Sequence, residues 1–159
     1  MIKISNKIIS NKSKTFFIAD IAANHDGSLK RAKKLIRLAA NSGADAAKFQ
    51  HFNANTIVSD IGFKMLNQKL SHQSKWKKSV FDVYKEASIN LNWTLELKEE
   101  CYKRGIIFFT SPYSLELVNI MNKYVPAFKI GSGDITWTEI INLIAKKNKP
   151  ILLATGASS

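Results

Sequence analysis

The chain has 159 residues, of which 45% are apolar, and a formal net charge of +12 at pH 7. These values fit one folded domain with a core of its own and argue against an intrinsically disordered chain. No apolar run approaches the roughly 20 residues that a membrane-spanning helix needs. The first twenty residues mix Lys and Asn with Ile and do not resemble a secretion signal. The sequence therefore predicts a cytoplasmic protein without a membrane partner.

The positive charge comes from 24 basic residues, of which 21 are Lys and 3 are Arg. Base readout and bidentate grips on phosphate favour Arg, and the lysines are scattered along the chain instead of forming a cluster. We therefore expect a solvated, Lys-rich surface and no nucleic-acid partner, with a mild attraction for anionic substrates. The single cysteine, Cys101, allows no internal disulfide and has no Cys or His cluster beside it that would hold zinc.

Five short runs, nearly all apolar, predict strands that are covered on both faces, as in a parallel sheet. They are residues 16–22 (FFIADIA), 46–50 (AAKFQ), 106–110 (IIFFT), 127–131 (AFKIG) and 151–155 (ILLAT). Polar residues follow each run, and a helical pattern follows those. Residues 1–14 are expected to form a small strand pair beneath the sheet.

Capping residues predict where the intervening helices begin and end. Ser28 is a suitable N-cap for a helix that stops near Gly43, and Thr94 and Ser114 are expected to cap the next two helices. Gly105 is expected to end the helix that Thr94 starts.

Two further helical segments are predicted on either side of these. An apolar face predicts one helix from Trp76, Val80, Val83, Tyr84 and Ala87, and Thr136 or Thr138 is expected to open the last helix. Residues 52–73 show no clear period, which predicts a long loop after the second strand.

Alternating strands and helices give either an open doubly wound sheet or a (β/α)8 barrel. The first strand lacks a Gly-rich fingerprint, and reactive side chains follow every strand, which is where barrel enzymes build their sites. We therefore predict an α/β fold, a partial TIM barrel with about five parallel βα units. Five strands do not close an eight-stranded barrel, so residues 1–159 are expected to be a truncated N-terminal part of such a domain.

Two lysines stand inside apolar strands, Lys48 in AAKFQ and Lys129 in AFKIG. An ammonium in a barrel interior is costly unless an anion accompanies it. One interpretation is a structural ion pair with Asp20 or Asp134. The other, which we favour, is that the two lysines bind a multiply charged anion.

Other strand-end residues admit two interpretations each. Ser132, within Gly131-Ser132-Gly133, suits an anion-binding backbone nest beside a cation. Asp20 and Asp134 could act as acid or base, or balance the lysines. His25, beside Asn24, could contact substrate or hold a turn. His51 and His72 lack metal-ligand spacing and are expected to be solvated loop residues.

These residues also carry a family resemblance. The segments IADIAANHDGSLKRAKKLIRLAANSGADAAKFQ, FFTSPYSLELV, VPAFKIGSGDITW and KPILLATGAS occur in one order with suitable spacing. From about Thr15 onward the sequence resembles the sialic acid synthase family, including its pseudaminate and legionaminate relatives.

The resemblance implies a reaction and its partners. Phosphoenolpyruvate attacks an open-chain N-acetyl amino sugar through its C3 carbon, water adds at C2, and phosphate leaves. The product is a nonulosonic acid of the sialic type. The resemblance also implies a divalent cation, Mn or Mg, in the intact enzyme, a homodimer, and a small C-terminal antifreeze-like domain. The metal-binding histidines and that domain belong to sequence beyond residue 159, so residues 1–159 alone are expected to be inactive.

Position by position, the resemblance assigns phosphoenolpyruvate to Lys48, Lys129 and Ser132, and the sugar to Gln50. Asp replaces the Glu of many members at two positions, and Ala154 stands where the family usually has a Ser that touches phosphate. We thus predict two catalytic residues, Asp20 and Asp134, and seven substrate-binding residues: Asn24, His25, Lys48, Gln50, Lys129, Ser132 and Thr155.

Two other functions are compatible with the same residues. A barrel aldolase would use Lys48 or Lys129 to form a Schiff base with a carbonyl substrate. A non-enzymatic anion- or nucleic-acid-binding module would use the Lys-rich surface instead, and its affinity would fall steeply with salt.

Overall fold

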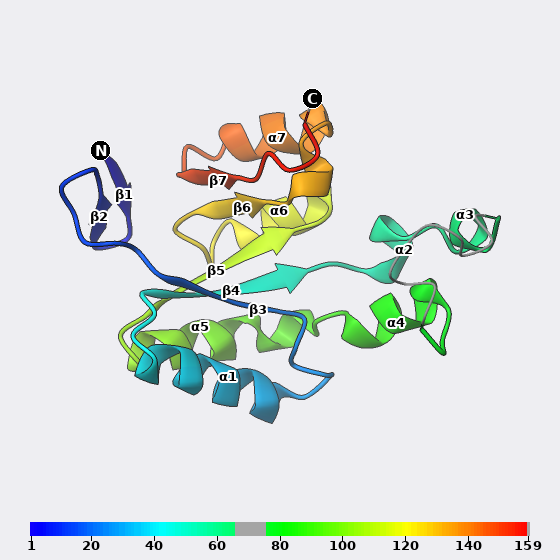
Figure 1. The fold of residues 1–159 in the computed structure, drawn as a ribbon, viewed down its shortest axis with the longest axis horizontal. Helices are drawn as coiled ribbons and strands as arrows, with labels where there is room; N and C mark the ends of the chain where they lie inside the picture. The colour runs from blue at the N-terminus through cyan, green and yellow to red at the C-terminus, as the bar shows by residue number, and fades with distance from the viewer. Residues whose placement is uncertain (66–75, 159) are drawn as a thin grey trace.

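A curved sheet of five parallel strands forms the centre of the computed structural model, which describes residues 1–65 and 76–158 (Figure 1). In order across the sheet these are β3 (Ile18–Ala22), β4 (Ala46–His51), β5 (Ile107–Pro112), β6 (Phe128–Ile130) and β7 (Ile151–Leu153). Each strand pairs with the next one along the chain, whereas a dinucleotide-binding sheet reverses its order after the first strand. The predicted α/β fold, part of a TIM barrel, is confirmed.

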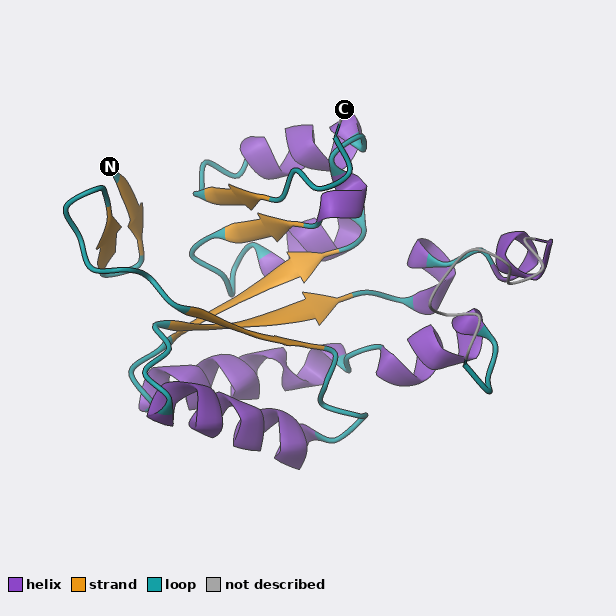
Figure 2. Ribbon diagram, viewed as in Figure 1, coloured by secondary structure: helices purple, strands orange, loops and turns teal. Residues whose placement is uncertain are grey.

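Four helices connect these strands and pack on the sheet (Figure 2). They are α1 (Leu29–Asn41), α5 (Thr94–Lys103), α6 (Leu115–Met121) and α7 (Thr138–Ala145). Helix α1 lies beside α5, and α6 lies beside α7. In α1, Ala32 and Ile36 are fully buried, since their spacing of four places both side chains on one helix face. Among the described residues, no helix is both long and apolar enough to cross a bilayer.

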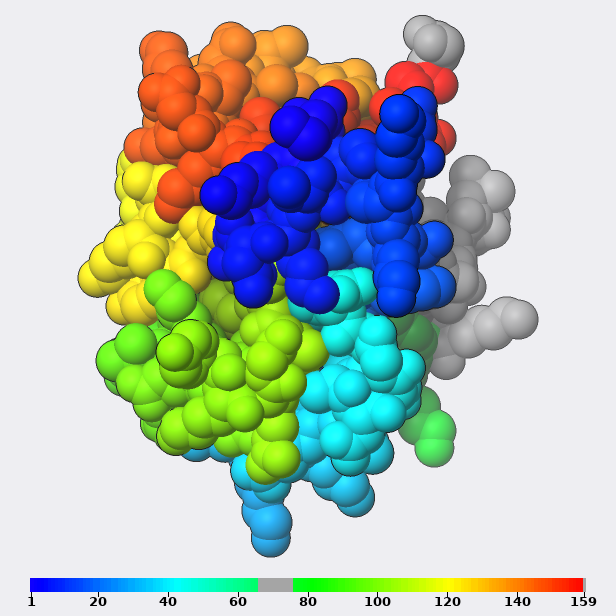
Figure 3. Space-filling model, turned by 90° about the vertical axis from the view of Figure 1, so that its left-hand side faces the viewer, coloured from blue at the N-terminus to red at the C-terminus, as the bar shows by residue number. Residues whose placement is uncertain are grey.

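The N-terminal strand pair lies at the amino ends of the sheet strands. Strands β1 (Ile2–Ile4) and β2 (Lys7–Ile9) pair antiparallel, and Figure 3 shows this hairpin in blue across that end of the molecule. The Lys7 ammonium lies 2.8 Å from one oxygen of Asp45, whose other oxygen accepts a hydrogen bond from the Phe17 N–H. Both contacts lower the pKa of Asp45, the Lys7 bond most strongly. The expected strand pair beneath the sheet is confirmed.

Most predicted helix boundaries agree with the structure. Ser28 and Ser114 accept N-capping hydrogen bonds, and Gly43 and Gly105 have the positive φ of helix-ending glycines. The prediction that Thr94 is an N-cap is wrong, because Thr94 is the first residue of α5 and its side chain is used elsewhere.

The last helix begins at Thr138, but no side chain caps it. The N-cap position belongs to Trp137, which makes no capping hydrogen bond. The prediction therefore gives the correct start of α7, but neither threonine hydroxyl caps the helix.

The segment after β4 is more regular than predicted. Residues 54–65 form two short helices, α2 (Ala54–Ile57) and α3 (Asp60–Met65), so the predicted long loop is wrong for this part. The rest of that predicted loop, with His72, lies outside the described residues. The next described helix is α4 (Val80–Ala87), which Ser79 caps. Trp76 precedes α4 and is not part of it. Two 3₁₀ turns, η2 (Leu91–Trp93) and η3 (Ser132–Asp134), complete the described elements.

One buried carboxylate joins the two neighbouring helices α1 and α5. Glu100 of α5, only 7% exposed, accepts from Arg37 of α1 at 2.8 Å and from Arg104 at 3.1 Å. These contacts, the Arg37 bond first, lower the pKa of Glu100 to about 2. Because the folded-state pKa lies below the ordinary value, the carboxylate stabilises the fold above about pH 4.5 and this contribution fades as the pH falls toward 2.

We predict that Glu100→Gln lowers the free energy of unfolding by about 1 to 3 kcal/mol at pH 7, because two charge-assisted bonds to a buried acceptor are weakened. The measurement is urea unfolding at pH 7 and pH 3. The loss should shrink at the lower pH, where the wild-type carboxylate gains protons in the unfolded chain. Glu99→Gln, the exposed neighbour without an ion pair among the described residues, is the control and should change stability little. Equal effects of the two substitutions would contradict the assignment.

Candidate functional site

The register of the sheet sorts the strand-end residues onto two faces. Lys48 lies opposite Phe109, and Gln50 lies opposite Ser111, in the pairing of β4 with β5. Since side chains alternate along a strand, Lys48, Gln50 and Ser111 share one face. His51, the residue after Gln50, points to the other face and reaches α5 through Thr94, so that face is the one that the helices cover. Lys48 and its companions therefore face the interior side of the barrel wall.

Lys48 is held by an ion pair with Asp20. Its ammonium lies 2.8 Å from an Asp20 oxygen across the β3–β4 pairing, in which the two residues are in register. The Lys48 side chain is 8% exposed and that of Asp20 is 59% exposed, so the pair connects the wall to the open mouth. An irregularity in the register of β3 follows Asp20 directly, as is common beside active sites. The ion-pair interpretation therefore holds for this lysine.

Lys129 is in a different situation. It follows Phe128, which pairs with Thr110 on the helix-covered face, so Lys129 lies on the same face as Lys48. Its ammonium donates to the Ile130 carbonyl, and no carboxylate of the described residues forms an ion pair with it. Burial lowers the pKa of Lys129, and the nearby charge of Lys48 lowers it further. Asp20 and Asp134 oppose this shift without cancelling it. Among the described residues, the two lysines thus have one ion pair between them, the one from Lys48 to Asp20.

Asp134 and Tyr113 meet beside Gly131. A methyl group on Gly131 would lie 3.0 Å from an Asp134 oxygen and 3.3 Å from the Tyr113 hydroxyl. Burial raises the pKa of Asp134, although a Gly131 backbone bond and Lys129 lower it in part. Gln50 donates to the same Tyr113 hydroxyl at 3.2 Å. Asp134, Tyr113 and Gln50 therefore form one polar group next to the lysines.

The segment after β7 packs on Ser132 of η3, two residues before Asp134 in the sequence. A Cβ on Gly156 would lie 3.1 Å from the Ser132 Cβ, so the backbone of the last described turn packs directly on η3. Thr155 is exposed in this turn, and its carbonyl accepts from Ser158. Ser132 is exposed next to Lys129, which is where the sequence predicts a phosphate contact.

Asn24 and His25 serve the turn that leads into α1. The Asn24 amide donates to the Ile21 carbonyl, and the buried His25 ring accepts from the Gly27 N–H through Nδ1. The other ring nitrogen of His25 has no partner among the described residues. Burial lowers the pKa of His25, which keeps the ring neutral. The structure supports the turn-holding interpretation, and substrate contact by these two residues stays a prediction.

His51 is fully buried, so the prediction of a solvated loop residue is wrong. The Thr110 hydroxyl donates to the Phe49 carbonyl, so it accepts from His51 Nδ1 at 2.7 Å. His51 Nε2 then accepts from the Thr94 hydroxyl at 3.2 Å. Burial lowers the pKa of His51 to about 3. The neutral ring therefore links β4, β5 and α5 through hydrogen bonds and leaves no lone pair for a metal.

A metal centre does not fit the residues present. Within residues 1–65 and 76–158, no three His, Cys, Asp or Glu side chains gather as metal ligands would. One Asp20 oxygen pairs with Lys48, and the buried histidine ring described above uses both its nitrogens. The divalent cation implied by the family resemblance stays a prediction.

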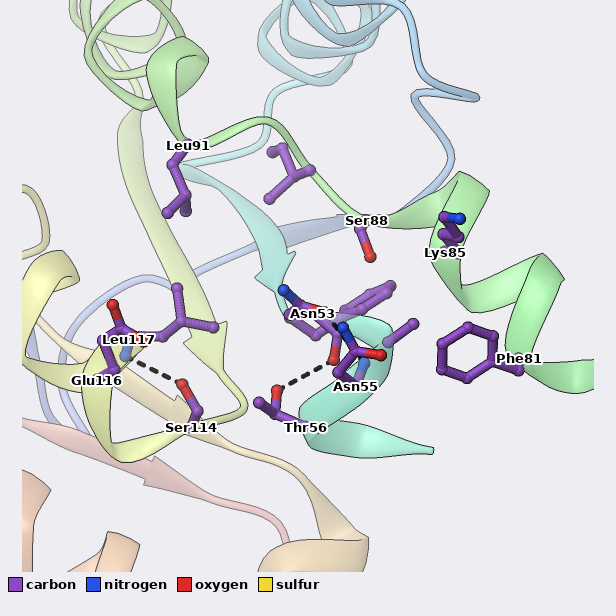
Figure 4. Close-up of a pocket in the computed structure, with 13 residues that line it drawn as sticks. Asn53, Asn55, Thr56, Phe81, Lys85, Ser88, Leu91, Ser114, Glu116 and Leu117 are labelled. Carbon is purple, nitrogen blue, oxygen red and sulfur yellow. Dashed lines mark hydrogen bonds between the residues drawn. The ribbon is translucent and has the colours of Figure 1, made fainter. Parts of the chain in front are cut away.

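A cavity of about 610 Å³ lies outside the lysine site, between α2, α4 and the loop after β5 (Figure 4). Its polar walls are used by the fold, since Ser114 accepts from the Leu117 N–H and Asn53 caps α2. Phe52 separates it from the site, with its ring 6.2 Å from that of Tyr113. The lysine cluster, and not this larger cavity, is the candidate site.

Two residues of the site, Ser111 and Tyr113, were not among the predicted site residues. Ser111 lies near the carboxyl end of β5 and Tyr113 directly follows the strand, and their spacing of two places them on the face of Gln50. That spacing was the available signal. The contact that gives Tyr113 its place, with a residue 63 positions away, is invisible to local patterns.

Comparisons with known proteins find relatives of this chain. Residues 35–159 match the family model described as the NeuB family. The N,N'-diacetyllegionaminic acid synthase of Campylobacter jejuni is 37% identical over 147 residues, which cover 92% of this chain and 43% of that protein. An uncharacterized protein of Methanocaldococcus jannaschii is 35% identical over 158 residues, 99% of this chain and 42% of its own length. The chain thus spans about two fifths of the length of these relatives.

A solved structure shares the fold. The N-acetylneuraminic acid synthetase of Leptospira borgpetersenii serovar Hardjo-bovis, in complex with citrate, superimposes with a TM-score of 0.81 at 26% identity. The superposition covers 99% of this chain and 50% of that one.

We predict that Gly131→Ala disturbs the site more than the fold. The added methyl group must displace the Asp134 carboxylate, which weakens the Gly131 backbone bond and raises the pKa of Asp134 further. The free energy of unfolding should fall by less than about 1 kcal/mol, because the displaced atom ends a movable side chain. Carbon-13 NMR titration of the Asp134 carboxyl measures the pKa.

Gly133→Ala is the matched control, because a Cβ there meets nothing within 4 Å apart from its two chain neighbours and the backbone φ is not positive. It should leave the Asp134 titration unchanged. An unshifted Asp134 pKa in Gly131→Ala would disprove the close packing of this group.

Proposed function

The chain belongs to the NeuB family, and we propose that it supplies the phosphoenolpyruvate-binding part of a synthase that condenses phosphoenolpyruvate with an N-acetyl amino sugar. The names of its relatives support this assignment, since they include a legionaminic acid synthase and an N-acetylneuraminate-9-phosphate synthase. The product would be a nonulosonic acid.

The observation that carries the proposal is the pair Lys48 and Lys129 on one face of the sheet. Lys48 has one carboxylate partner, Lys129 has no ion-pair partner among the described residues, and burial lowers the pKa of the latter. A ligand with both a phosphate and a carboxylate would give Lys129 the anionic partner that it lacks among the described residues. Phosphoenolpyruvate carries both groups on adjacent oxygen and carbon atoms. Charge-assisted contacts of this kind are strong where water is excluded.

The proposed reaction forms one carbon–carbon bond and one carbon–oxygen bond from water to C2, and it breaks the carbon–oxygen bond between C2 and the phosphate. The C3 carbon of phosphoenolpyruvate attacks the aldehyde carbon of the open-chain sugar, and the aldehyde oxygen takes up a proton. Water adds to C2 and loses a proton, and the bond from C2 to the phosphate oxygen breaks. Phosphate leaves, and C2 becomes the ketone of a 2-oxo acid.

Residues of this chain supply the proton transfers in the proposal. Asp134, whose pKa is raised by burial, keeps a proton at higher pH than an ordinary aspartate and donates it to the aldehyde oxygen. Asp20 is held as a partner of Lys48 at the mouth and accepts the proton that the attacking water loses. Ser132 contacts the phosphate, and Gln50 contacts the sugar.

One observation favours a second candidate, a Schiff-base aldolase. A lysine with a lowered pKa, such as Lys129, is the nucleophile that imine formation requires. Borohydride separates the two mechanisms when it is added with pyruvate or with phosphoenolpyruvate and an N-acetyl amino sugar. Covalent, irreversible labelling of Lys129 would replace the proposed condensation with the aldolase mechanism, because the condensation forms no imine.

We predict that Lys129→Met weakens phosphoenolpyruvate binding by well over tenfold. Removing one partner of a buried charge pair costs about 2 to 5 kcal/mol, and 1.4 kcal/mol corresponds to tenfold. The ligand-free fold should keep its stability or gain some, since a partly buried cation without an ion pair is unfavourable. Isothermal titration calorimetry measures the affinity for phosphoenolpyruvate. Unfolding in urea measures the ligand-free stability.

Lys146→Met removes an exposed lysine at the end of α7 and serves as the charge-matched control, with unchanged binding expected. If Lys129→Met instead lost several kcal/mol of ligand-free stability, Lys129 would be a structural ion-pair member. Normal phosphoenolpyruvate affinity in Lys129→Met would overturn the anion-site assignment.

A further inference from the structure

We propose that a second binding site, for a nucleoside monophosphate, lies at the amino ends of the sheet strands, opposite the lysine site. It is a cavity of about 510 Å³ between the β1–β2 turn, the end of α5 and the segment that joins α6 to β6. Figure 3 views this end of the molecule, with the hairpin in blue, the end of α5 in green and residues 123–126 in yellow. The inference goes beyond the proposed synthase reaction and does not depend on it.

The cavity is separate from the candidate site. It reaches β5 at the first residues of the strand, Ile107 and Phe108, whereas Ser111 lies near the carboxyl end. Strands rise about 3.3 Å per residue, so roughly 13 Å of strand separate Ile107 from Ser111. A ligand in this cavity would therefore leave the phosphoenolpyruvate site open.

The wall of the cavity is positively charged. Its described lining residues include Lys98 and Lys123 but no Asp or Glu. The Lys123 ammonium lies 5.0 Å from the centroid of the Tyr124 ring, and that of Lys98 lies 6.0 Å from it. Neither ammonium forms an ion pair within residues 1–65 and 76–158. An anion in the cavity would thus meet two ammonium groups that are held beside one ring.

A third lysine adds to the positive charge and fixes the wall. The Lys149 ammonium donates to the carbonyls of Asn122 and Val125, which hold the segment after α6 in place. Burial lowers the pKa of Lys149, and the charge of Lys98 lowers it further. Lys98 therefore stands in a positive surrounding, in which binding an anion relieves repulsion between like charges.

Two lysines favour a phosphate monoester over a carboxylate. A phosphate monoester carries a charge of about −1.5 to −2 at pH 7 and has three acceptor oxygens, so one group can meet both Lys98 and Lys123. A carboxylate carries a single charge and would neutralise only one of them.

The aromatic residues favour a ligand with a flat ring. Tyr102 and Tyr124 both line the cavity, and Tyr102 is 85% exposed, so its ring is free to stack on a ligand. The floor is apolar, because Ile106 and Phe108 are buried beneath it. Nucleobases stack on aromatic side chains of this kind. A sugar phosphate without a base would leave the exposed ring of Tyr102 unused.

The turn of the hairpin supplies polar groups at the rim. Ser5 and Asn6 line the cavity, and their side chains have no hydrogen-bond partner among the described residues. A hydroxyl and an amide can pair with the hydroxyl groups of a ribose. Phosphate, ribose and base thus each have a matching part of the wall.

The first test measures binding to the intact protein that carries this chain. Isothermal titration calorimetry is carried out with AMP, CMP, GMP and UMP, with the matching nucleosides and with inorganic phosphate. We expect at least one nucleotide to bind about tenfold or more tightly than its nucleoside and than inorganic phosphate, since each of these lacks one kind of contact. The proposal is wrong if no nucleotide binds at millimolar concentration, or if inorganic phosphate binds as tightly as the best nucleotide.

Substitutions of exposed residues assign the contacts without disturbing the core. Lys123→Met should weaken nucleotide binding about tenfold and leave nucleoside binding unchanged, because only the phosphate contact is lost. Lys34→Met, an exposed lysine of α1 outside the cavity, is the matched control and should bind normally. Equal losses in the two variants would assign the binding to the general positive charge of the surface and overturn the site.

The ring contact is tested in the same way. Tyr102→Leu should weaken nucleotide binding about tenfold and leave inorganic phosphate unaffected, whereas Tyr102→Phe keeps the ring and should bind almost normally. Normal nucleotide affinity in Tyr102→Leu would contradict the stacking contact and with it the choice of a nucleotide.

One further variant separates this site from the proposed function. Lys129→Met should keep its nucleotide affinity, and phosphoenolpyruvate should not displace the nucleotide from the wild-type protein. Displacement, or loss of nucleotide binding in Lys129→Met, would place the nucleotide in the lysine site and overturn the inference. Because the readout is binding and not turnover, a protein without synthase activity would refute the proposed function and leave this test intact.

Discussion

The register between β4 and β5 is the constraint on which the site depends. Gln50 lies beside Ser111, and Lys48, two residues earlier in β4, lies on the same face. A shift of this pairing by one residue would turn Lys48 toward the helices and His51 toward the mouth. Burial disfavours such a shift, since Phe49 and Phe108 fill the core and a shift by one residue would turn them to the other face. The apolar residues between the functional ones thus determine where the functional ones point.

The helix-covered face and the interior face of the strands differ in how their polar side chains are paired. On the helix side, a neutral His51 and two threonine hydroxyls satisfy one another completely, so no charge has to be buried. On the interior side, Lys48 is paired with Asp20, whereas Lys129 forms no ion pair with a described residue. Saturated polar networks rigidify a structure, whereas incompletely compensated charges create affinity for a ligand. The rigid face therefore supports the binding face.

Features that depend on neighbours in sequence could be predicted, and features that depend on distant partners could not. Ser28 and Ser114 cap their helices because the bonds they accept lie three residues ahead. Thr94 has the same local pattern, yet its hydroxyl belongs to His51, 43 residues away. The five strands and the lysines inside them followed from the apolar runs, although β5 ends two residues later and β7 two residues earlier than predicted. The bond between Gln50 and Tyr113 requires the sheet to be assembled first.

The sequential strand order has a consequence for how the chain is made. Each strand docks beside the strand that precedes it in the sequence, from β3 through β7. A ribosome delivers the chain in this same direction, so every new strand finds its template already formed. No strand has to wait for a later one to be inserted between it and its predecessor. The nascent sheet can therefore grow one βα unit at a time, and its growing edge is the surface that cellular chaperones would meet during synthesis.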